Sequence, residues 1–193
     1  MVIDKRLFVA IEISEELKNE LLKISSKYQD KDIRWTKDKN LHITVQFLGN
    51  IKSVYTKQIE QELDDIAQNT NRFRLTIDKI IYAPPGETKN MIWVVLSDGS
   101  GYKNLTLKIS NALRKYIDNN LLTKDKNVMR EQRTAHITLA RFKSYLKFDD
   151  LNLENIRIQN KELEVGGYSL WESFRGSRGT EYKILKKFKF KNV

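Results

Sequence analysis

The chain of 193 residues has no cysteine, only two prolines and only two histidines. Without cysteine there can be no disulfide, no thiol nucleophile and no cysteine-ligated zinc site. No apolar run is long enough to span a bilayer, and the apolar stretch from Leu7 to Ile13 is too short and contains Glu12, so it does not match a signal peptide. We therefore expect a cytoplasmic protein with no membrane association.

Acidic residues are in the minority, because 25 Asp and Glu face 35 Lys and Arg, which gives a net charge of +10. Such an excess favours a polyanionic partner, nucleic acid first, although a lysine-rich solvated surface would have the same composition. Residues 123–133 are polar and basic, and we expect them to form a loop that contacts phosphates of such a partner. The cations of this basic loop are Lys124, Lys126, Arg130 and Arg133.

The two histidines stand in the same sequence pattern. His42 begins His-Ile-Thr-Val and His136 begins His-Ile-Thr-Leu, 94 residues later (136 minus 42). Imidazole has an unperturbed pKa of ~6.5, which lets it give or take a proton near neutral pH. A single histidine on a strand is more often structural, but a matched pair with no other histidine in the chain predicts one general acid and one general base.

The spacing of each motif predicts a half-buried strand. Residues 41–47 alternate apolar and polar, which puts Leu41, Ile43, Val45 and Phe47 on a buried face and His42, Thr44 and Gln46 on an open one. Residues 135–139 repeat the scheme, with His136 and Thr138 on the open face. Each copy thus offers a proton carrier and, about 7 Å along the strand, a hydroxyl that can donate to an anionic oxygen.

A metal site is the other functional interpretation of two histidines. Zinc sites usually need three or four Cys, His or carboxylate ligands, and the chain has no cysteine. We therefore expect no metal and no other cofactor.

The order of predicted elements favours an antiparallel α+β fold. Helices and strands mix without regular βαβ alternation, and no linker or low-complexity tract divides the chain. Gly49-Asn50 is expected to end the strand of the first motif, and Ser14 to cap the first helix. Predicted strands cover 6–13, 41–47, 73–82, 91–97, 135–139, 156–171 and 180–190, and predicted helices cover 15–28, 53–68 and 102–122.

On these motifs the chain resembles the 2H phosphoesterase superfamily, and within it the RNA 2′,3′-cyclic phosphodiesterase (2′-5′ RNA ligase) family. The resemblance runs over most of the chain. It rests on Arg-Leu-Phe-Val-Ala-Ile at 6–11, Asn-Leu-His-Ile-Thr-Val-Gln-Phe-Leu-Gly at 40–49, Met-Ile-Trp-Val at 91–94, Ala-His-Ile-Thr-Leu-Ala-Arg at 135–141, and Ser173 with Tyr182.

The resemblance implies a single bilobal domain over residues 1–193. Its two pseudo-symmetric lobes, each an antiparallel sheet with helices on its outer face, would flank a central groove. It implies hydrolysis of a terminal 2′,3′-cyclic phosphate to a 2′-phosphate without metal, and a reversible 2′-5′ ligation. His42 would be the proton donor, His136 the proton acceptor, and Thr44 and Thr138 the phosphate-binding hydroxyls.

Two further residues of the site are less directly predicted. Arg141 matches the family arginine that binds phosphate, but it has the wrong parity for the face of His136, so its side chain must reach round the strand end or a bulge must re-aim it. Phe8 has the parity of the open face, where it would stack on the terminal base or simply pack as a lining residue.

Two other functions remain open at this point. One keeps the site and changes the substrate to a 2′,5′-linked oligonucleotide, a small cyclic nucleotide or ADP-ribose cyclic phosphate. The other is a non-catalytic RNA-binding protein. In each case the expected partner is RNA or a nucleotide, and we expect a monomer.

Overall fold

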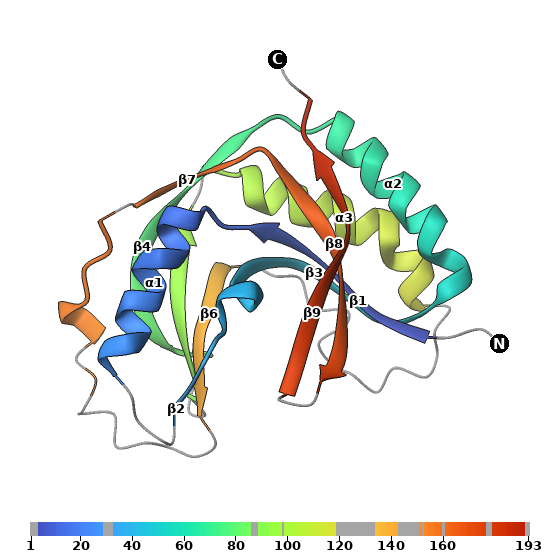
Figure 1. Ribbon diagram of the computed structural model, residues 1–193. Helices are drawn as coiled ribbons and strands as arrows, with labels where there is room; N and C mark the ends of the chain where they lie inside the picture. Colours follow the sequence, from blue (N-terminus) through green and yellow to red (C-terminus); the bar gives the residue numbers. More distant parts are fainter. Residues whose placement is uncertain are drawn as a thin grey trace.

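The computed structural model describes residues 4–28, 33–85, 89–97, 99–118, 134–142, 151, 153–159, 161–176 and 179–191 (Figure 1). Its strands are β1 (Asp4–Glu12), β2 (Ile33–Trp35), β3 (His42–Lys52), β4 (Phe73–Ala83), β5 (Met91–Ser97), β6 (Ala135–Phe142), β7 (Glu162–Val165), β8 (Gly167–Gly176) and β9 (Gly179–Lys189). Its helices are α1 (Glu15–Lys27), α2 (Thr56–Gln68) and α3 (Gly101–Asp118). Short 3-10 turns cover Asp38–Asn40, Ser53–Tyr55 and Leu153–Asn155.

The described strands form one antiparallel sheet made of two halves. The order is β7-β4-β5-β6-β3-β1-β8-β9, and β2 also pairs with β6. The two halves meet where β3 and β6 pair antiparallel at Ile43 and Ile137. Each half of this order therefore has a histidine motif on its innermost strand, which confirms the predicted fold class and its two-fold arrangement.

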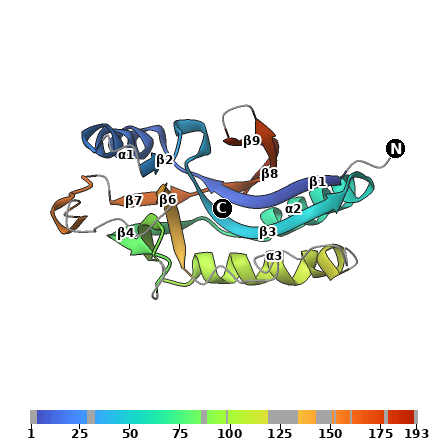
Figure 2. The same cartoon turned by 90° about the horizontal axis from the view of Figure 1, so that it is seen from below.

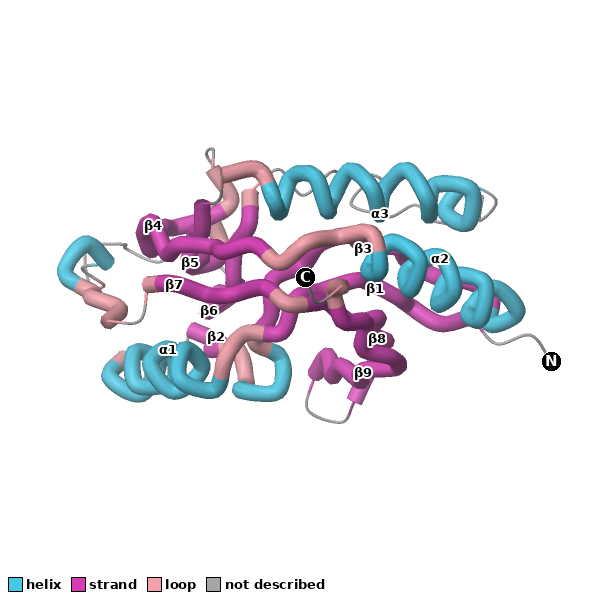
Figure 3. The backbone as a smooth tube through the Cα atoms, turned by 90° about the horizontal axis from the view of Figure 1, so that it is seen from above, coloured by secondary structure: helices cyan, strands magenta, loops and turns pink. Residues whose placement is uncertain are grey.

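The described helices all pack on the same face of this sheet. Leu21 of α1, Leu63 of α2 and Ile109 of α3 share one core with strand residues such as Val9 and Ile137. Figures 1 and 3 show α1 over the half that contains β4 and β7, and α2 and α3 over the other half. Figure 2 shows α3 running beside β3. We call the opposite side of the sheet the open face.

The open face carries a small aromatic cluster of its own. Phe8, Ala10 and Trp171 are buried there, with Phe47, Tyr182 and Ile184 packed around them. Because Phe8, Ala10 and Trp171 come from the adjacent strands β1 and β8, this second cluster lies directly beside His42 on β3.

The helices follow their sequence signals closely. The side chain of Ser14 accepts a hydrogen bond of 3.2 Å from the backbone N–H of Leu17, as an N-cap does, and two glutamates follow in the first turn. The predicted core positions Leu17, Leu21 and Ile24 are buried. The helix predicted over 102–122 is described as far as Asp118.

Two predictions about strand ends are wrong. Gly49 does not end the strand, because its φ of +74° accommodates an extra residue and β3 continues to Lys52. The strand predicted over 156–171 is two strands, β7 on β4 and β8 on β1, which belong to different halves. Gly167 begins the second, where a Cβ would meet the carbonyl oxygen of Phe188 at 2.2 Å.

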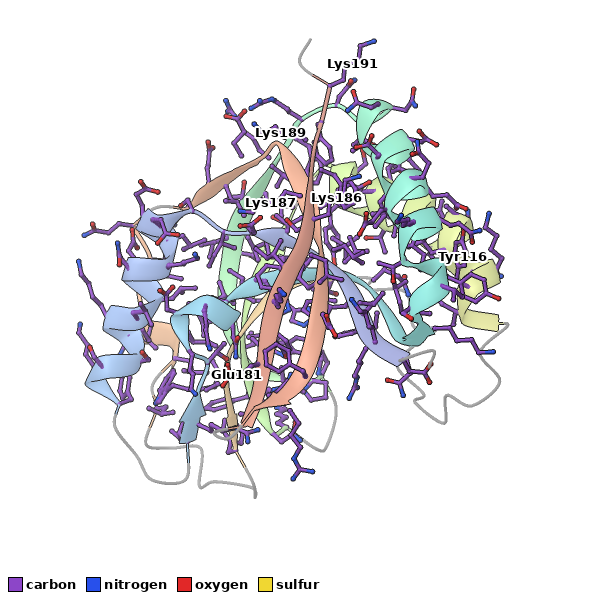
Figure 4. All side chains as sticks on the ribbon, turned by 45° about the vertical axis from the view of Figure 1, so that its right-hand side comes forward. Tyr116, Glu181, Lys186, Lys187, Lys189 and Lys191 are labelled. Atoms are coloured by element: carbon purple, nitrogen blue, oxygen red, sulfur yellow. The ribbon has the colours of Figure 1, made fainter. Side chains whose placement is uncertain are left out.

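One edge of the sheet is strongly cationic. β9 is the edge strand, and Lys186, Lys187 and Lys189 lie along it, with Lys191 beyond its end (Figure 4). Lysines on an exposed edge oppose pairing with the edge of another molecule.

Candidate active site

A bulge follows the first histidine motif. Ala10 pairs with Thr44 and Val9 pairs with Gln46, so Val45 is an extra residue in β3. An extra residue reverses the alternation of faces beyond it. The predicted faces of Gln46 and Phe47 are therefore wrong: Gln46 is 1% exposed on the helix-covered face with Val9, whereas Phe47 packs on Phe8 on the open face.

A second bulge lies at the equivalent position of β6. Trp93 pairs with Thr138 and Ile92 pairs with Ala140, so Leu139 is the extra residue, three positions after His136 as Val45 is three after His42. The bulge brings Arg141 to the face of His136 and Thr138. Of the two possibilities that the sequence left open, a reach round the strand end or a bulge, the structure shows the bulge. The two motifs are thus equivalent in backbone as well as in sequence.

The seam between the halves brings the two motifs together. The Cα partners there are Ile43 and Ile137. An antiparallel register about this pair places His42 opposite Thr138 and Thr44 opposite His136, all on the open face. Both imidazoles and both hydroxyls therefore surround one point near the local two-fold axis.

The same type of hydrogen bond to a backbone carbonyl oxygen orients both imidazoles. His42 Nδ1 lies 2.7 Å from the carbonyl oxygen of Asn40, and His136 Nδ1 lies 2.9 Å from that of Thr134, in each case two residues earlier. Because a carbonyl oxygen only accepts, Nδ1 must carry a proton and donate it. In the neutral ring, Nε2 then has the free lone pair. His42 Nε2 lies 3.0 Å from the Thr44 hydroxyl oxygen.

Aromatic rings surround His42 on the β1 and β8 side. Its ring centroid lies 5.1 Å from that of Phe8 and 5.6 Å from that of Trp171, and Tyr182 meets it edge-on at 5.3 Å. Burial lowers the pKa of His42 to about 4, and the nearby charges of His136 and Arg141 act in the same direction, against the hydrogen bond to Asn40. The ring is neutral in the free protein at neutral pH.

His136 is covered by a tryptophan. The indole of Trp93 on β5 is stacked on it, with ring centroids 3.8 Å apart and an interplanar angle of 19°. Burial lowers the pKa of His136, with a contribution from the charge of Arg141, although the hydrogen bond to Thr134 opposes both.

The structure places the remaining predicted residues as follows. Thr44 and Thr138 lie on the open face beside the histidines, and Thr44 is 7% exposed. The Arg141 guanidinium donates to the sulfur of Met91 at 2.9 Å and lies close enough to Tyr182 and Arg34 for both to affect its pKa. Phe8 is 2% exposed beneath His42. Its packing is that of a lining residue, and a base could stack on it only after the neighbouring rings had moved.

Three aromatic residues of the site lay outside the sequence prediction: Trp93, Trp171 and Tyr182. Trp93 and Tyr182 stand in segments that carry the family resemblance, yet no local pattern placed them on a histidine. Their positions depend on which strands are neighbours, because β5 lies beside β6 and β8 beside β1.

The part of the chain that the structure describes has neither a metal-ligand cluster nor a membrane-spanning helix. No three His, Asp or Glu side chains among its residues are grouped as metal ligands would be. None of its helices has the length and apolar character needed to cross a membrane. The basic loop at 123–133 lies outside the described residues.

Comparison with known proteins gives consistent results. The family model described as LigT like phosphoesterase matches residues 11–93. A protein of Aquifex aeolicus named RNA 2′,3′-cyclic phosphodiesterase is 27% identical over 183 residues, which cover 92% of this chain and 89% of that protein. One of the same name from Methanocaldococcus jannaschii is 24% identical and covers 95% of this chain and 99% of its own length.

Solved structures share the fold. TT0787 of Thermus thermophilus superimposes with a TM-score of 0.78 at 21% identity, covering 96% of this chain and 97% of that one. Apo LigT of E. coli gives a TM-score of 0.72 at 21% identity, covering 98% and 99%. In its matched motifs and in relatives that align over most of its length, the chain is similar to the LigT-like phosphoesterases of the 2H superfamily.

Proposed function

We propose that this protein is an RNA 2′,3′-cyclic phosphodiesterase that opens a terminal 2′,3′-cyclic phosphate to a 2′-phosphate and a free 3′-hydroxyl. The observation that carries the proposal is the pair of imidazoles on one face of the sheet, each fixed through Nδ1 by a carbonyl oxygen, across a seam of antiparallel strands. Relatives that match nearly the whole chain bear this name.

In the proposed reaction the two histidines act on opposite sides of the phosphorus. His136 Nε2 takes a proton from water as the water oxygen attacks phosphorus. The bond from phosphorus to O3′ breaks, and His42 Nε2 gives its proton to O3′. In-line displacement requires a base and an acid on opposite sides, and one general acid or base typically contributes about 10²–10⁴-fold.

The substrate supplies the negative charge that the free site lacks. Burial, with a contribution from the nearby charges of His136 and Arg141, lowers the pKa of His42 to about 4, so this ring is neutral before substrate binds. A bound phosphodiester carries a negative charge, which raises the pKa of an adjacent imidazole. The hydrogen bond from Nδ1 to the carbonyl oxygen of Asn40 also favours the protonated ring. Binding and protonation of His42 are thus coupled.

The phosphoryl oxygens are held by hydroxyls and one guanidinium. We assign Thr44 and Thr138 as hydrogen-bond donors to the two non-bridging oxygens, and Arg141 as the cation that offsets the charge developing on them. Arg141 can serve in this way because the bulge at Leu139 turns it to the open face. Base stacking by Phe8 stays a prediction.

The test is an assay of purified, chelator-treated protein on an RNA that ends in a 2′,3′-cyclic phosphate. We expect turnover in chelator and a product with a 2′-phosphate. Activity that requires a divalent ion would contradict the metal-free mechanism. A 3′-phosphate product would show that O2′, and not O3′, is the leaving oxygen. The monomeric state and the cytoplasmic location stay predictions, and gel filtration of the same sample tests the first.

The histidines are tested one at a time. His42→Ala and His136→Ala should each lower the rate by about 10²–10⁴-fold. Circular dichroism should show that both variants are folded. Unchanged turnover in the double variant would exclude this chemistry, and RNA affinity retained by a protein that never turns over would favour the non-catalytic alternative.

A further inference from the structure

Arg34 and Arg141 lie directly opposite each other on adjacent strands. They are Cα partners in the pairing of β2 with β6, and Arg141 is also the partner of Met91 on β5. Directly opposed residues of an antiparallel pair project from the same face of the sheet. Arg34, which is exposed, therefore stands on the open face next to the arginine assigned to the cyclic phosphate.

This like-charge pair differs from the other opposed charged pairs in the described strands. Asp4 faces Lys52, Arg74 faces Glu164 and Glu172 faces Lys183, each with opposite signs. Like charges directly opposite each other destabilise a sheet. The opposed pair Arg34 and Arg141 therefore lies beside the histidine motif of β6, and it lowers the stability of the folded chain.

No carboxylate among the described residues compensates the two guanidiniums. The ion pairs of that part of the chain include neither Arg34 nor Arg141. The described partner of Arg141 is the sulfur of Met91, which is a weak acceptor. The charge of Arg34 also contributes to lowering the pKa of Arg141. An anionic ligand larger than one phosphate would relieve this repulsion.

We propose that Arg34 binds the 5′-phosphate of the terminal nucleotide, beside the cyclic phosphate held at Arg141. The inference rests on the proposed function and adds a substrate preference to it. A nucleoside 2′,3′-cyclic phosphate with nothing at its 5′ oxygen offers Arg34 no anion, and no described carboxylate takes that place. A nucleotide that is also phosphorylated at the 5′ position, as every 3′-terminal nucleotide of an RNA strand is, occupies both arginines.

The planar guanidinium suits this task because it presents paired N–H donors to a phosphate. Sequence readout is not involved, since a backbone phosphate is common to every RNA. Arg34 is therefore a residue that selects RNA ends over free cyclic nucleosides, whatever the terminal base is.

The experiment compares two substrates that differ only at the 5′ position. These are adenosine 2′,3′-cyclic phosphate and its 5′-phosphorylated form, and the measured quantity is the ratio of their kcat/KM values. We expect the wild type to prefer the 5′-phosphorylated form by about tenfold or more. Arg34→Gln should bring the ratio close to one, and Arg34→Lys should restore part of it.

Arg74→Gln is the matched control, because Arg74 is another strand arginine that opposes a charged residue, Glu164. It should keep the wild-type ratio. A purely structural role of Arg34 would lower both kcat/KM values equally and leave their ratio unchanged. That result, or a wild-type ratio near one, would overturn the inference while leaving the proposed function intact.

A binding measurement separates the inference from catalysis. Calorimetry should show that wild-type protein binds adenosine 2′,5′-bisphosphate about tenfold more tightly than adenosine 2′-phosphate, and that Arg34→Gln loses the difference. Equal affinities in the wild type would overturn the inference. If neither cyclic substrate were turned over, the proposed function would fail, whereas the binding ratio would still decide the role of Arg34.

Discussion

At the scale of single residues, each imidazole donates from Nδ1 to a carbonyl oxygen two residues earlier, but the two rings have different neighbours. Three aromatic rings surround His42, whereas a stacked indole covers His136 and a guanidinium lies nearby. At the position five residues after each histidine, one half has Phe47 and the other has Arg141. This difference breaks the two-fold symmetry of the site, so the two histidines can take different roles.

The lowered pKa values predict an acidic optimum for the free enzyme. The profile of kcat/KM requires one protonated and one neutral histidine, so it is bell-shaped between their two apparent pKa values. Since burial lowers both pKa values below 6.5, that of His42 to about 4, we expect the maximum of kcat/KM below pH 6.5. Above both pKa values the acid is lost, and below both the base is lost.

The profile of kcat should lie at higher pH than that of kcat/KM. It reports the enzyme–substrate complex, in which the bound phosphodiester raises the pKa of the histidines. Steady-state rates on a cyclic nucleotide between about pH 4 and pH 9 give both profiles. A kcat/KM maximum above about pH 7 would contradict the burial of these imidazoles.

Trp93 is predicted to act on His136 through stacking. In Trp93→Leu the imidazole becomes more exposed, so its pKa should rise toward 6.5 and kcat should fall on the order of tenfold, since aromatic pairs contribute ~0.5–1.5 kcal/mol. Trp35→Leu is the control, because the Trp35 indole donates to the carbonyl oxygen of Tyr28. It should lower stability without moving the pH profile; a similar shift in both variants would refute a specific role for Trp93.

At the scale of secondary structure elements, helix α3 supports the first motif from the opposite face of the sheet. The buried Tyr102 hydroxyl donates to the carbonyl oxygen of Thr44 at 2.7 Å, next to the bulge at Val45. A bulge disrupts the ladder of backbone hydrogen bonds, so this side chain satisfies a carbonyl group at the point of disruption. The helix thus fixes the backbone that carries His42 and Thr44.

Tyr102→Phe should therefore affect both stability and activity. The substitution removes one buried hydrogen bond, which typically contributes about 0.5–1.5 kcal/mol to the free energy of unfolding. We also expect a lower kcat, since Thr44 is less well positioned. Tyr168→Phe is the control: its hydroxyl donates to the carbonyl oxygen of Leu63 on α2, so stability should fall but kcat should not. Equal kcat values for the two variants would show that α3 does not position the site.

At the scale of the whole molecule, the net charge of +10 predicts salt-sensitive binding of long RNA. Each phosphate contact on a single strand contributes ~0.7 to the slope of log affinity against log salt concentration. Replacing Lys124, Lys126, Arg130 and Arg133 by alanine should reduce that slope, and it should weaken binding of long RNA more than turnover of a mononucleoside cyclic phosphate. Identical slopes for the variant and the wild type would show that the basic loop does not bind the strand.

The amino-acid sequence by itself determined the local features. The period-two pattern of the motif strands, the helical stripes and the cap at Ser14 depend on interactions within a few residues, so they could be predicted. The repeated His-Ile-Thr motif identified both imidazoles and both hydroxyls for the same reason: each pair lies two positions apart on one strand.

Tertiary structure decided what depends on neighbouring strands. The hydrogen-bond register with β1 makes Val45 a bulge, and the register with β5 makes Leu139 one. These bulges put Phe47 and Arg141 on the open face and Gln46 in the core. Gly49 continued a strand for the same reason. The stacking of Trp93 on His136 and the opposition of Arg34 and Arg141 join residues far apart in the chain, and only the pairing of β5 and β2 with β6 brought them together.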